Sequence, residues 1–448
     1  MYTTMKTTLL QKTLILLLSI LPMLSVQTLY AQSAANGDAG GDAESNVENL
    51  PLPLNEVRIF AEVLNRIRSA YVEPIDDQTL LENAVRGMLA GIDPHSSYLA
   101  NEAFDLLQEN TTGEFGGLGV EVGISNGFIT IISPVDGSPA DVAGIQAGDI
   151  VIKIDDTPTT DITIEETTEL MRGEPGTDVV LTVLREGVDE AFEITVTRDV
   201  IRSRSVRSRF VEPGFGYVRI SQFVTGTGDE VVTALENLHL SSTDLKGIIL
   251  DLRNNPGGVL QAAVDVVDAF ITEGLIVYTE GREDSAFTRY EATSADPSQG
   301  VPMIVLINQG SASASEVVAG ALQDHGRAVI MGTQSFGKGS VQTVLPLTND
   351  RAIKLTTALY YTPNGRSIQA RGITPNIIVR QGRVTSVPDN LAIYREQDLA
   401  GHLENNDDPE LTPDAIDLTS EEVIVRDYQL NEALNILKGI ALMQTRRL

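Results

Sequence analysis

The sequence contains no cysteine, which excludes thiol catalysis, a disulfide framework and a cysteine-linked lipid anchor. Basic residues are also scarce: 32 Lys and Arg stand against 62 Asp and Glu, a formal net charge of −30 that is spread along the chain. This balance argues against nucleic acid or an anionic membrane surface as the main partner. At 448 residues the chain is long enough for two or three domains.

A short apolar run with basic residues before it begins the chain. Lys6 and Lys12 precede the run that starts at Leu14, and Ala31 offers a small residue for cleavage. This pattern predicts a secretory signal peptide over residues 1–31 and therefore an extracytoplasmic protein, periplasmic if the source is a bacterium. The run is short for a membrane span, although an uncleaved anchor stays open.

The remaining chain divides by composition and periodicity into segments that together predict a multidomain α/β protein. These segments are an acidic flexible linker (32–52), a helical region (53–110), a Gly-rich unit of short β-type runs with one helix (111–200), a block of alternating strands and helices (201–383), and an acidic stretch with a terminal helix (384–448).

Histidine is scarce as well, which limits the roles open to Ser313. This serine precedes an apolar helical pattern, and with Glu316 it fits a capping box, so it needs no catalytic role. His325 lies near the far end of the same expected helix, roughly 18 Å away at about 1.5 Å per residue, and cannot be its base. The other three histidines stand in loop-like or helix-end contexts typical of surface or packing residues: His95, His239 and His402.

A lysine can serve as the base if burial lowers its pKa. Lys338 lies in the apolar, Gly-rich stretch "TQSFGKGSVQ". Ser335 and Lys338 also match the Ser-x-x-Lys dyad of penicillin-binding enzymes, but that dyad needs a helix, which Gly337 and Gly339 disfavour. An acyltransferase that uses Ser335 is nevertheless one alternative. The chain has neither the G-x-S-x-G elbow around Ser313 nor an H-E-x-x-H zinc motif.

Four ordered motifs resemble those of the C-terminal processing peptidases, also called tail-specific proteases. They are "DLRNNPGG" (251–258), "SASASE" (311–316), "FGKGSVQ" (336–342) and "GRSIQARGITPN" (365–376). The resemblance implies a dyad of nucleophile Ser313 and general base Lys338, at the family's spacing of 25 residues, with Gln342 orienting the lysine amine. It also implies a crotonase-like protease core with an inserted PDZ domain, flanked by N- and C-terminal helical segments, and no metal or other cofactor.

Two amide clusters follow from the same resemblance. A helix start at Ser313 would face developing negative charge with free N–H groups, so Ala314 is expected to supply one oxyanion donor and Gly257 or Gly258 a second. The unit 111–200 resembles a PDZ domain, whose amides would face a peptide C-terminus while the peptide adds to a sheet edge. The amides expected there belong to Leu118, Gly119 and Val120. Arg172 stands where the family couples this domain to the protease core.

The resemblance therefore predicts an extracytoplasmic serine endopeptidase that recognises the C-terminal tails of protein substrates. The alternative is a catalytically silent PDZ-containing binding protein on a protease-like core. An adaptor lipoprotein is a further expected partner. The chain is also expected to form a homo-oligomer through apolar helix faces at 54–90 or 421–442. One departure stands out: Asn376 occupies a position where the family usually has Asp, which puts a local turn contact in doubt.

Overall fold

The computed structural model describes residues 52–100, 102–125, 127–135, 137–160, 162–241, 245–282, 286–293, 296–348, 351–382, 403 and 427–445. The expected signal peptide, nearly all of the acidic linker and the acidic stretch of the C-terminal segment lie outside these residues. The chain divides into two units, residues 1–81 and 82–448, and each is described by itself.

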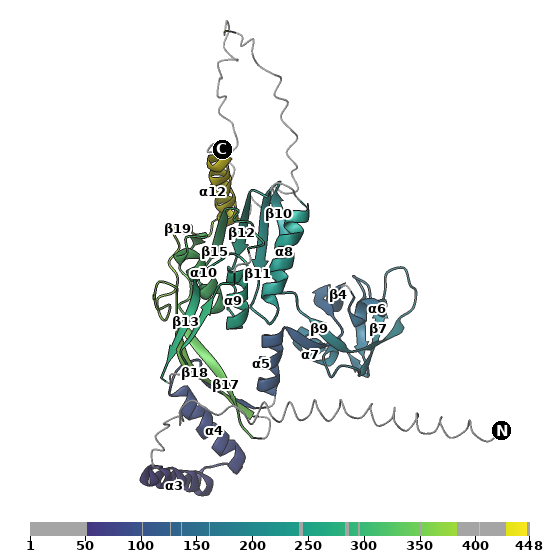
Figure 1. Ribbon diagram of the computed structural model, residues 1–448. Coiled ribbons are helices and arrows are strands. Elements are labelled where there is room, and N and C mark those ends of the chain that lie inside the picture. Colours follow the sequence, from purple (N-terminus) through teal and green to yellow (C-terminus); the bar gives the residue numbers. More distant parts are fainter. Residues whose placement is uncertain are drawn as a thin grey trace, which may run out of the picture. The chain divides into compact units, whose positions relative to one another are not determined.

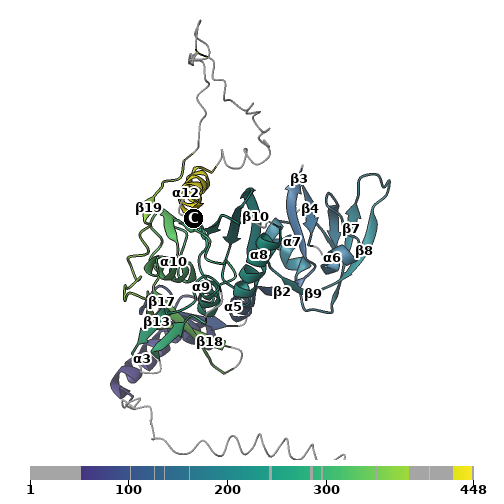
Figure 2. The ribbon, with the colours of Figure 1, turned by 45° about the horizontal axis from the view of Figure 1, so that its top comes forward.

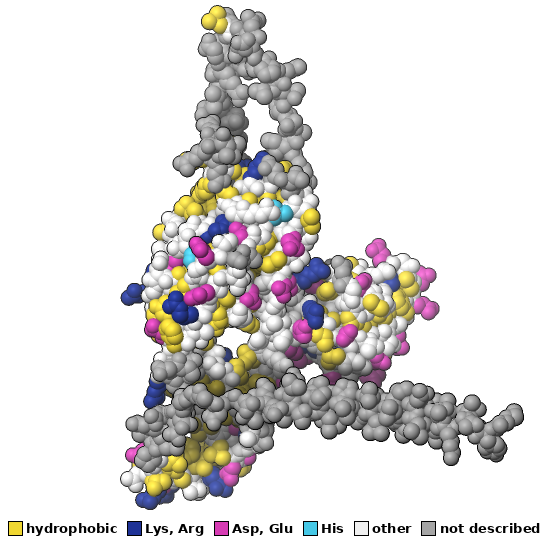
Figure 3. All heavy atoms as spheres, viewed as in Figure 1, with side chains coloured by type: hydrophobic (Ala, Val, Ile, Leu, Met, Phe, Trp, Pro, Cys, Tyr) yellow, Lys and Arg dark blue, Asp and Glu magenta, His cyan; other side chains and the backbone are white. Residues whose placement is uncertain are grey.

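The first unit contains α3 (Leu54–Ala70) and the beginning of α4 (Asp77–Ala90). No residue of α3 is buried, although its apolar side chains recur on one face as the sequence predicts. These side chains belong to Leu54, Val57, Phe60, Val63 and Ile67. Figure 3 shows hydrophobic side chains, in yellow, over this helix. The apolar face of α3 is thus exposed to solvent.

The second unit begins with elements that the sequence did not separate. The region 53–110, expected to be helical, also contains the strand β1 (Ser97–Ala100) before α5 (Glu102–Thr112). A four-residue strand shows no period of its own, and β1 forms because its register places Ser97 opposite Lys354, far along the chain. The chain then passes through β2 (Glu114–Gly117), which pairs with β9 (Asp199–Arg202).

A small antiparallel sheet follows, as the short β-type runs predict, with two helices where the sequence indicated one. Its strand order is β3-β4-β5-β7-β8, with β6 pairing β5, so β3 lies at an edge. The strands are β3 (Val120–Ser125), β4 (Phe128–Pro134), β5 (Ile150–Ile154), β6 (Thr157–Pro158), β7 (Asp178–Leu184) and β8 (Phe192–Thr197). The helices are α6 (Pro139–Val142) and α7 (Ile164–Met171), and α7 packs beside β3.

The largest core is a six-stranded sheet of order β10-β11-β12-β15-β16-β19 (Figure 1). Only β10 and β11 are antiparallel; the other neighbours are parallel. The strands are β10 (Val206–Glu212), β11 (Phe215–Ile220), β12 (Gly247–Asp251), β15 (Met303–Ile307), β16 (Val329–Gly332) and β19 (Ile377–Ile378). Every residue of β12 and β15 is buried, as expected for parallel strands covered on both faces.

Helices cover both faces of this sheet. Alternate side chains such as Ile248 and Val305 pack with α8 (Thr227–Ser241), α9 (Leu260–Asp268) and α10 (Ala314–Asp324). Ile249 and Leu306 point the other way, toward α12 (Tyr428–Thr445). Figure 2 gives a second view of this arrangement. The apolar face of the terminal helix, for which the sequence left self-association open, is therefore used in the core.

A second sheet carries the segment around Lys338. Its order is β1-β18-β13-β14, and β17 also pairs with β18, outside this order. Its remaining strands are β13 (Leu275–Gly281), β14 (Thr288–Glu291), β17 (Ser340–Pro346) and β18 (Arg351–Tyr361). Among the described residues, no helix is both long enough and apolar enough to cross a membrane.

Candidate active site

Ser313 stands at the start of α10 in a strained conformation. Its φ of 55° and ψ of −115° lie outside the regions that non-glycine residues usually occupy. The Glu316 N–H donates to the Ser313 carbonyl oxygen at 2.8 Å, so the backbone of this serine belongs to the expected helix cap. Strain of this kind persists only where the surroundings enforce it, which is common at functional sites.

Glu316 joins the Ser313 segment to the Lys338 segment. Its Oε2 accepts from the Ser313 N–H and from the Lys338 N–H, both at 2.8 Å. Its Oε1 accepts from the Ser335 hydroxyl at 2.6 Å and from the Gly337 N–H at 2.7 Å. Because two backbones share one oxygen atom, the two residues are direct neighbours in space. The sequence showed Glu316 only as a helix cap, and its second role depends on residues 19–22 positions away.

The environment of Lys338 lowers the pKa of its amine. Burial lowers the pKa of Lys338, and the nearby charge of Lys354 lowers it further, while Asp93 and Glu316 act in the opposite direction. A lysine with a lowered pKa has a larger neutral fraction at a given pH and can accept a proton. Within the described residues, no hydrogen bond joins Lys338 Nζ to Ser313 Oγ, so the two residues are adjacent but their side chains are not hydrogen-bonded to each other.

Gln342 lies on β17, and its side-chain amide contacts neighbouring strand residues. Its Nε2 donates to the Ser340 hydroxyl at 2.9 Å and weakly to the Thr356 hydroxyl at 3.5 Å. Thr356 on β18 also contacts the turn before β1, because the Thr356 N–H donates to Ser96 Oγ at 3.1 Å. Asp93 closes this turn by accepting from the Ser96 hydroxyl at 2.6 Å. The "DPHS" turn is thereby docked next to Gln342.

His95 belongs to the same turn, in a place that the sequence did not indicate. Burial lowers its pKa, and the charge of Lys338 lowers it further. A half-buried position still fits the surface or packing role that the sequence predicts for His95. Its nearness to Lys338 has no signal in the sequence, because the docking of this turn depends on β1 pairing with β18. His325 conforms to expectation: it caps the far end of α10, and its Nε2 hydrogen-bonds the Leu275 carbonyl group at 2.8 Å.

The serines that flank Ser313 are fully buried and attach α10 to the "NNPGG" turn. The Ser311 hydroxyl donates to the Leu252 carbonyl oxygen at 2.8 Å, and the Ser315 hydroxyl donates to the Asn255 carbonyl oxygen at 3.0 Å. The Ala312 N–H donates to the same Asn255 oxygen at 3.0 Å. Ser311 and Ser315, expected only to begin the helix, thus fix the turn against Ser313.

This turn brings glycine backbone directly against the serine. A Cβ on Gly257, whose φ is +100°, would lie 2.7 Å from the Ser313 Cβ. The Gly257 N–H donates to Asn255 Oδ1 at 2.9 Å and is engaged within the turn. In contrast, the amides of Gly258 and Ala314 have no hydrogen-bond partner within the described part of the chain. Of the three expected oxyanion donors, these two have free N–H groups.

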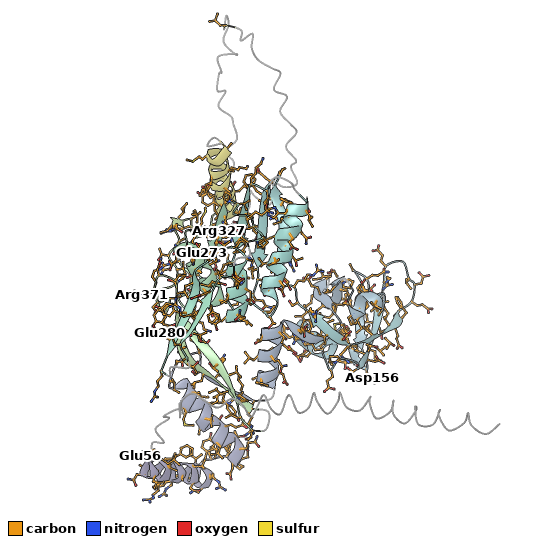
Figure 4. All side chains as sticks on the ribbon, in the orientation of Figure 1. Glu56, Asp156, Glu273, Glu280, Arg327 and Arg371 are labelled. Carbon is orange, nitrogen blue, oxygen red and sulfur yellow. The ribbon has the colours of Figure 1, made fainter. Side chains whose placement is uncertain are left out.

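The turn is also held from the C-terminal side. Arg253 donates to the fully buried carboxylate of Asp251 at 2.6 Å and to Asp427, directly before α12, at 2.7 Å. Elsewhere, Arg327 (labelled in Figure 4) fixes the far end of α10 by donating to the Phe270 carbonyl oxygen at 2.9 Å. Both ends of the site's scaffold are therefore held by half-buried guanidinium groups.

The local geometry does not support Ser335 as a nucleophile. Its hydroxyl donates to Glu316 and accepts from the Ile373 N–H at 2.6 Å, and the side chain is 7% exposed. Residues 334–339 form no helix, so Ser335 and Lys338 lack the helical spacing that the penicillin-binding dyad needs.

Asn376, which stands where the family usually has Asp, accepts hydrogen bonds from two neighbouring elements. Its side-chain oxygen accepts from the Ile330 N–H at 2.9 Å and from Gln323 at 3.2 Å. These contacts need an acceptor atom but not a charge, so an amide serves in this turn.

The expected peptide-binding loop has its carbonyl groups turned inward. The Leu118 carbonyl oxygen accepts from the Ala140 N–H at 2.9 Å, and that of Gly119 accepts from the Val135 N–H at 2.8 Å. The amides of Leu118 and Gly119 have no hydrogen-bond partner among the described residues. Val120 begins the edge strand β3 directly afterwards. The loop thus presents donors next to an open strand edge.

Arg172 directly follows α7 and contacts α5. Its guanidinium lies over the Phe115 ring, 5.0 Å from the centroid, and donates to Glu109 at 2.8 Å. Its Nε is buried without a hydrogen-bond partner among the described residues. Arg172 therefore links α7, a helix of the small antiparallel sheet, to α5, which precedes that sheet in the chain.

Comparison with known proteins agrees with this arrangement. Residues 214–379 match the model of peptidase family S41, residues 130–185 match a PDZ domain model, and residues 23–103 match the model of the activating protease CtpB N-terminal domain. A carboxy-terminal-processing protease of Bartonella bacilliformis is 45% identical over 382 residues, 85% of this chain and 88% of that protein. One of Synechocystis sp. is 38% identical over 325 residues, 70% of this chain and 75% of that protein.

Among solved structures, the photosystem II D1 C-terminal processing protease is 28% identical, with a TM-score of 0.42, over 72% of this chain and 93% of that one. The chain belongs to peptidase family S41 and, within it, to the carboxy-terminal-processing proteases. It is therefore a serine peptidase with a PDZ domain, and the family resemblance seen in the sequence is confirmed.

Proposed function

We propose that the protein is an endopeptidase that cleaves substrates with a Ser313/Lys338 dyad. The observation that carries this proposal is the shared Glu316 Oε2, to which the Ser313 and Lys338 amides both donate at 2.8 Å. A serine and a half-buried lysine held by one carboxylate oxygen can form a nucleophile–base pair after a change of side-chain rotamer.

The reaction then follows from the positions of these groups. Ser313 Oγ attacks the substrate carbonyl carbon while Lys338 Nζ takes its proton. The amides of Ala314 and Gly258 stabilise the oxyanion, helped by the positive end of α10. The Lys338 ammonium group returns the proton to the leaving amine, and the peptide bond breaks. Water, deprotonated by the neutral lysine, then attacks the acyl ester and releases Ser313. Gln342 is proposed to turn toward the amine during this cycle.

Cleavage of an unfolded protein by wild type, Ser313→Ala and Lys338→Ala tests the dyad. Both variants should lose activity by at least 10³-fold, because a nucleophile and its base act as a unit. Retained activity in either variant would refute the dyad. Binding of the substrate by wild type without cleavage would instead support the silent binding protein.

Substrate recognition is proposed to use the loop at Leu118, Gly119 and Val120. The free amides of the first two residues and the open edge of β3 suit a terminal carboxylate followed by an extended peptide. Fluorescence anisotropy with peptides that end in a free acid or an amide tests this proposal. Weaker binding of the amide form by at least tenfold is expected, and equal binding would contradict it.

The remaining parts of the proposal rest on the sequence. They comprise the domain limits given above, a crotonase-like spiral core, secretion by the segment 1–31, an adaptor lipoprotein, and coupling of the PDZ domain to the core by Arg172. Self-association is proposed to use the exposed apolar face of α3. Light scattering of wild type and Phe60→Asp tests that proposal, with a smaller particle expected for the variant and an unchanged particle contradicting it.

A further inference from the structure

Tyr360, near the end of β18, contacts the backbone beside the proposed general base. Its N–H donates to the Gly339 carbonyl oxygen at 3.0 Å, which extends the β17–β18 pairing by one step past Ser340. Its phenol hydroxyl donates to the Lys338 carbonyl oxygen. The side chain is 2% exposed, so its position is fixed by packing.

The other polar groups of this backbone already have partners. The N–H groups of Gly337 and Lys338 donate to Glu316, and the Gly339 N–H donates to Gln369 Oε1 at 2.9 Å. Within the described residues, the Tyr360 hydroxyl is the one donor to the Lys338 carbonyl group. Removing this hydroxyl would therefore leave the Lys338 carbonyl group without its hydrogen-bond donor.

The phenol of Tyr360 is held in its protonated, donating form, because burial raises its pKa. A phenol has one proton, and Tyr360 donates it to the Lys338 carbonyl oxygen. The hydroxyl can therefore act on the proposed dyad through the position of the Lys338 backbone.

We propose that Tyr360 is a positioning residue for the dyad, whose hydroxyl anchors the Lys338 backbone. This inference rests on the proposed Ser313/Lys338 mechanism. It assigns Tyr360 no contact with the substrate, so its loss should affect turnover and leave substrate affinity unchanged.

The test compares Tyr360→Phe with Tyr361→Phe in the full-length protein. Phenylalanine keeps the ring and removes only the hydroxyl. Tyr361 is the matched control, because it is the next residue on the same strand and its ring stacks on Tyr278 at 5.1 Å between centroids. The measurements are kcat and KM for an unfolded protein substrate and the melting temperature, with Ser313→Ala and Lys338→Ala assayed beside them.

The proposal expects kcat of Tyr360→Phe to fall about tenfold, the order expected for one lost hydrogen bond to an aligned group, while KM stays within twofold. Tyr361→Phe should keep wild-type kinetics. A kcat of Tyr360→Phe within twofold of wild type, an equal loss in Tyr361→Phe, or a loss explained by the unfolded fraction would each overturn it. Activity in Ser313→Ala or Lys338→Ala would instead refute the dyad itself, so the two failures are distinguishable.

Discussion

Substituting Gly257 by alanine places one methyl group between the "NNPGG" turn and Ser313, the proposed nucleophile. The new Cβ would lie 2.7 Å from both the Ser313 Cβ and the Ala312 carbonyl oxygen, and 3.0 Å from the Ala314 nitrogen. Ordinary contact begins near 3.4 Å, so turn and helix start must separate by about 0.7 Å. A displacement of this order at reacting groups lowers the rate by about 10²-fold.

Backbone strain adds a second cost that a control can isolate. Gly257 has a φ of +100°, where an alanine costs about 1–3 kcal/mol of folding free energy. Gly326, beyond the other end of α10, has a φ of +63° and nothing within 4 Å of an added Cβ. Gly326→Ala therefore carries backbone strain, about 1–2 kcal/mol, without a contact near the serine.

The assay is the initial cleavage rate per folded molecule for wild type and both variants, with melting temperatures measured in parallel. Gly257→Ala should lose about 10²-fold in kcat, while Gly326→Ala should melt earlier and keep its kcat. If Gly257→Ala retained more than about a third of wild-type kcat, the turn would not lie against the reacting serine as described.

Three further predictions concern charge and packing. Lys354→Gln removes a charge that lowers the pKa of Lys338, so the rising limb of the pH profile of kcat/KM should move to higher pH; Lys354→Arg should leave it in place. Asp427→Asn weakens its ion pair with Arg253 and should reduce the urea-derived unfolding free energy by about 1–3 kcal/mol; no change would show that α12 does not support the turn. Leu434→Ala, at a side chain that is 1% exposed, should cost about 2–5 kcal/mol by the same measurement, and a loss below about 1 kcal/mol would argue against α12 as part of the core.

The sequence predicts those parts of the fold whose signals are local. The apolar run at 247–251 is a buried strand, and the pattern after Ser313 is a helix, as periodicity indicates. Pairing of β1 with β18 is not predicted, since Ser97 and Lys354 lie far apart in the chain and the four-residue strand has no distinctive pattern. The neighbours of Lys338 in the "DPHS" turn depend on that pairing and were missed with it.

The candidate site also depends on contacts between residues that are distant in the sequence, which local patterns do not predict. Motif spacing selects Ser313 and Lys338, but spacing alone does not say what holds them together. That role belongs to Glu316, and the capping-box pattern indicates only half of its function, because that motif spans just the four residues from Ser313 to Glu316. Tyr360 carried no sequence signal at all, since a tyrosine in an apolar strand is more often packing than chemistry.

Glu316 also explains why a helix cap and a nucleophile can share one residue. Burial raises the pKa of this carboxyl group, against the hydrogen bonds from Ser335, Gly337, Lys338 and Ser313 that lower it, so its charge is held at a cost. An apolar residue of similar size would avoid that cost but would leave four donors unpaired. Because the carboxylate caps the Ser313 N–H, and the Ser313 carbonyl group accepts from the helix, the hydroxyl is not needed for capping. The serine can therefore begin the helix with its backbone and act chemically with its side chain.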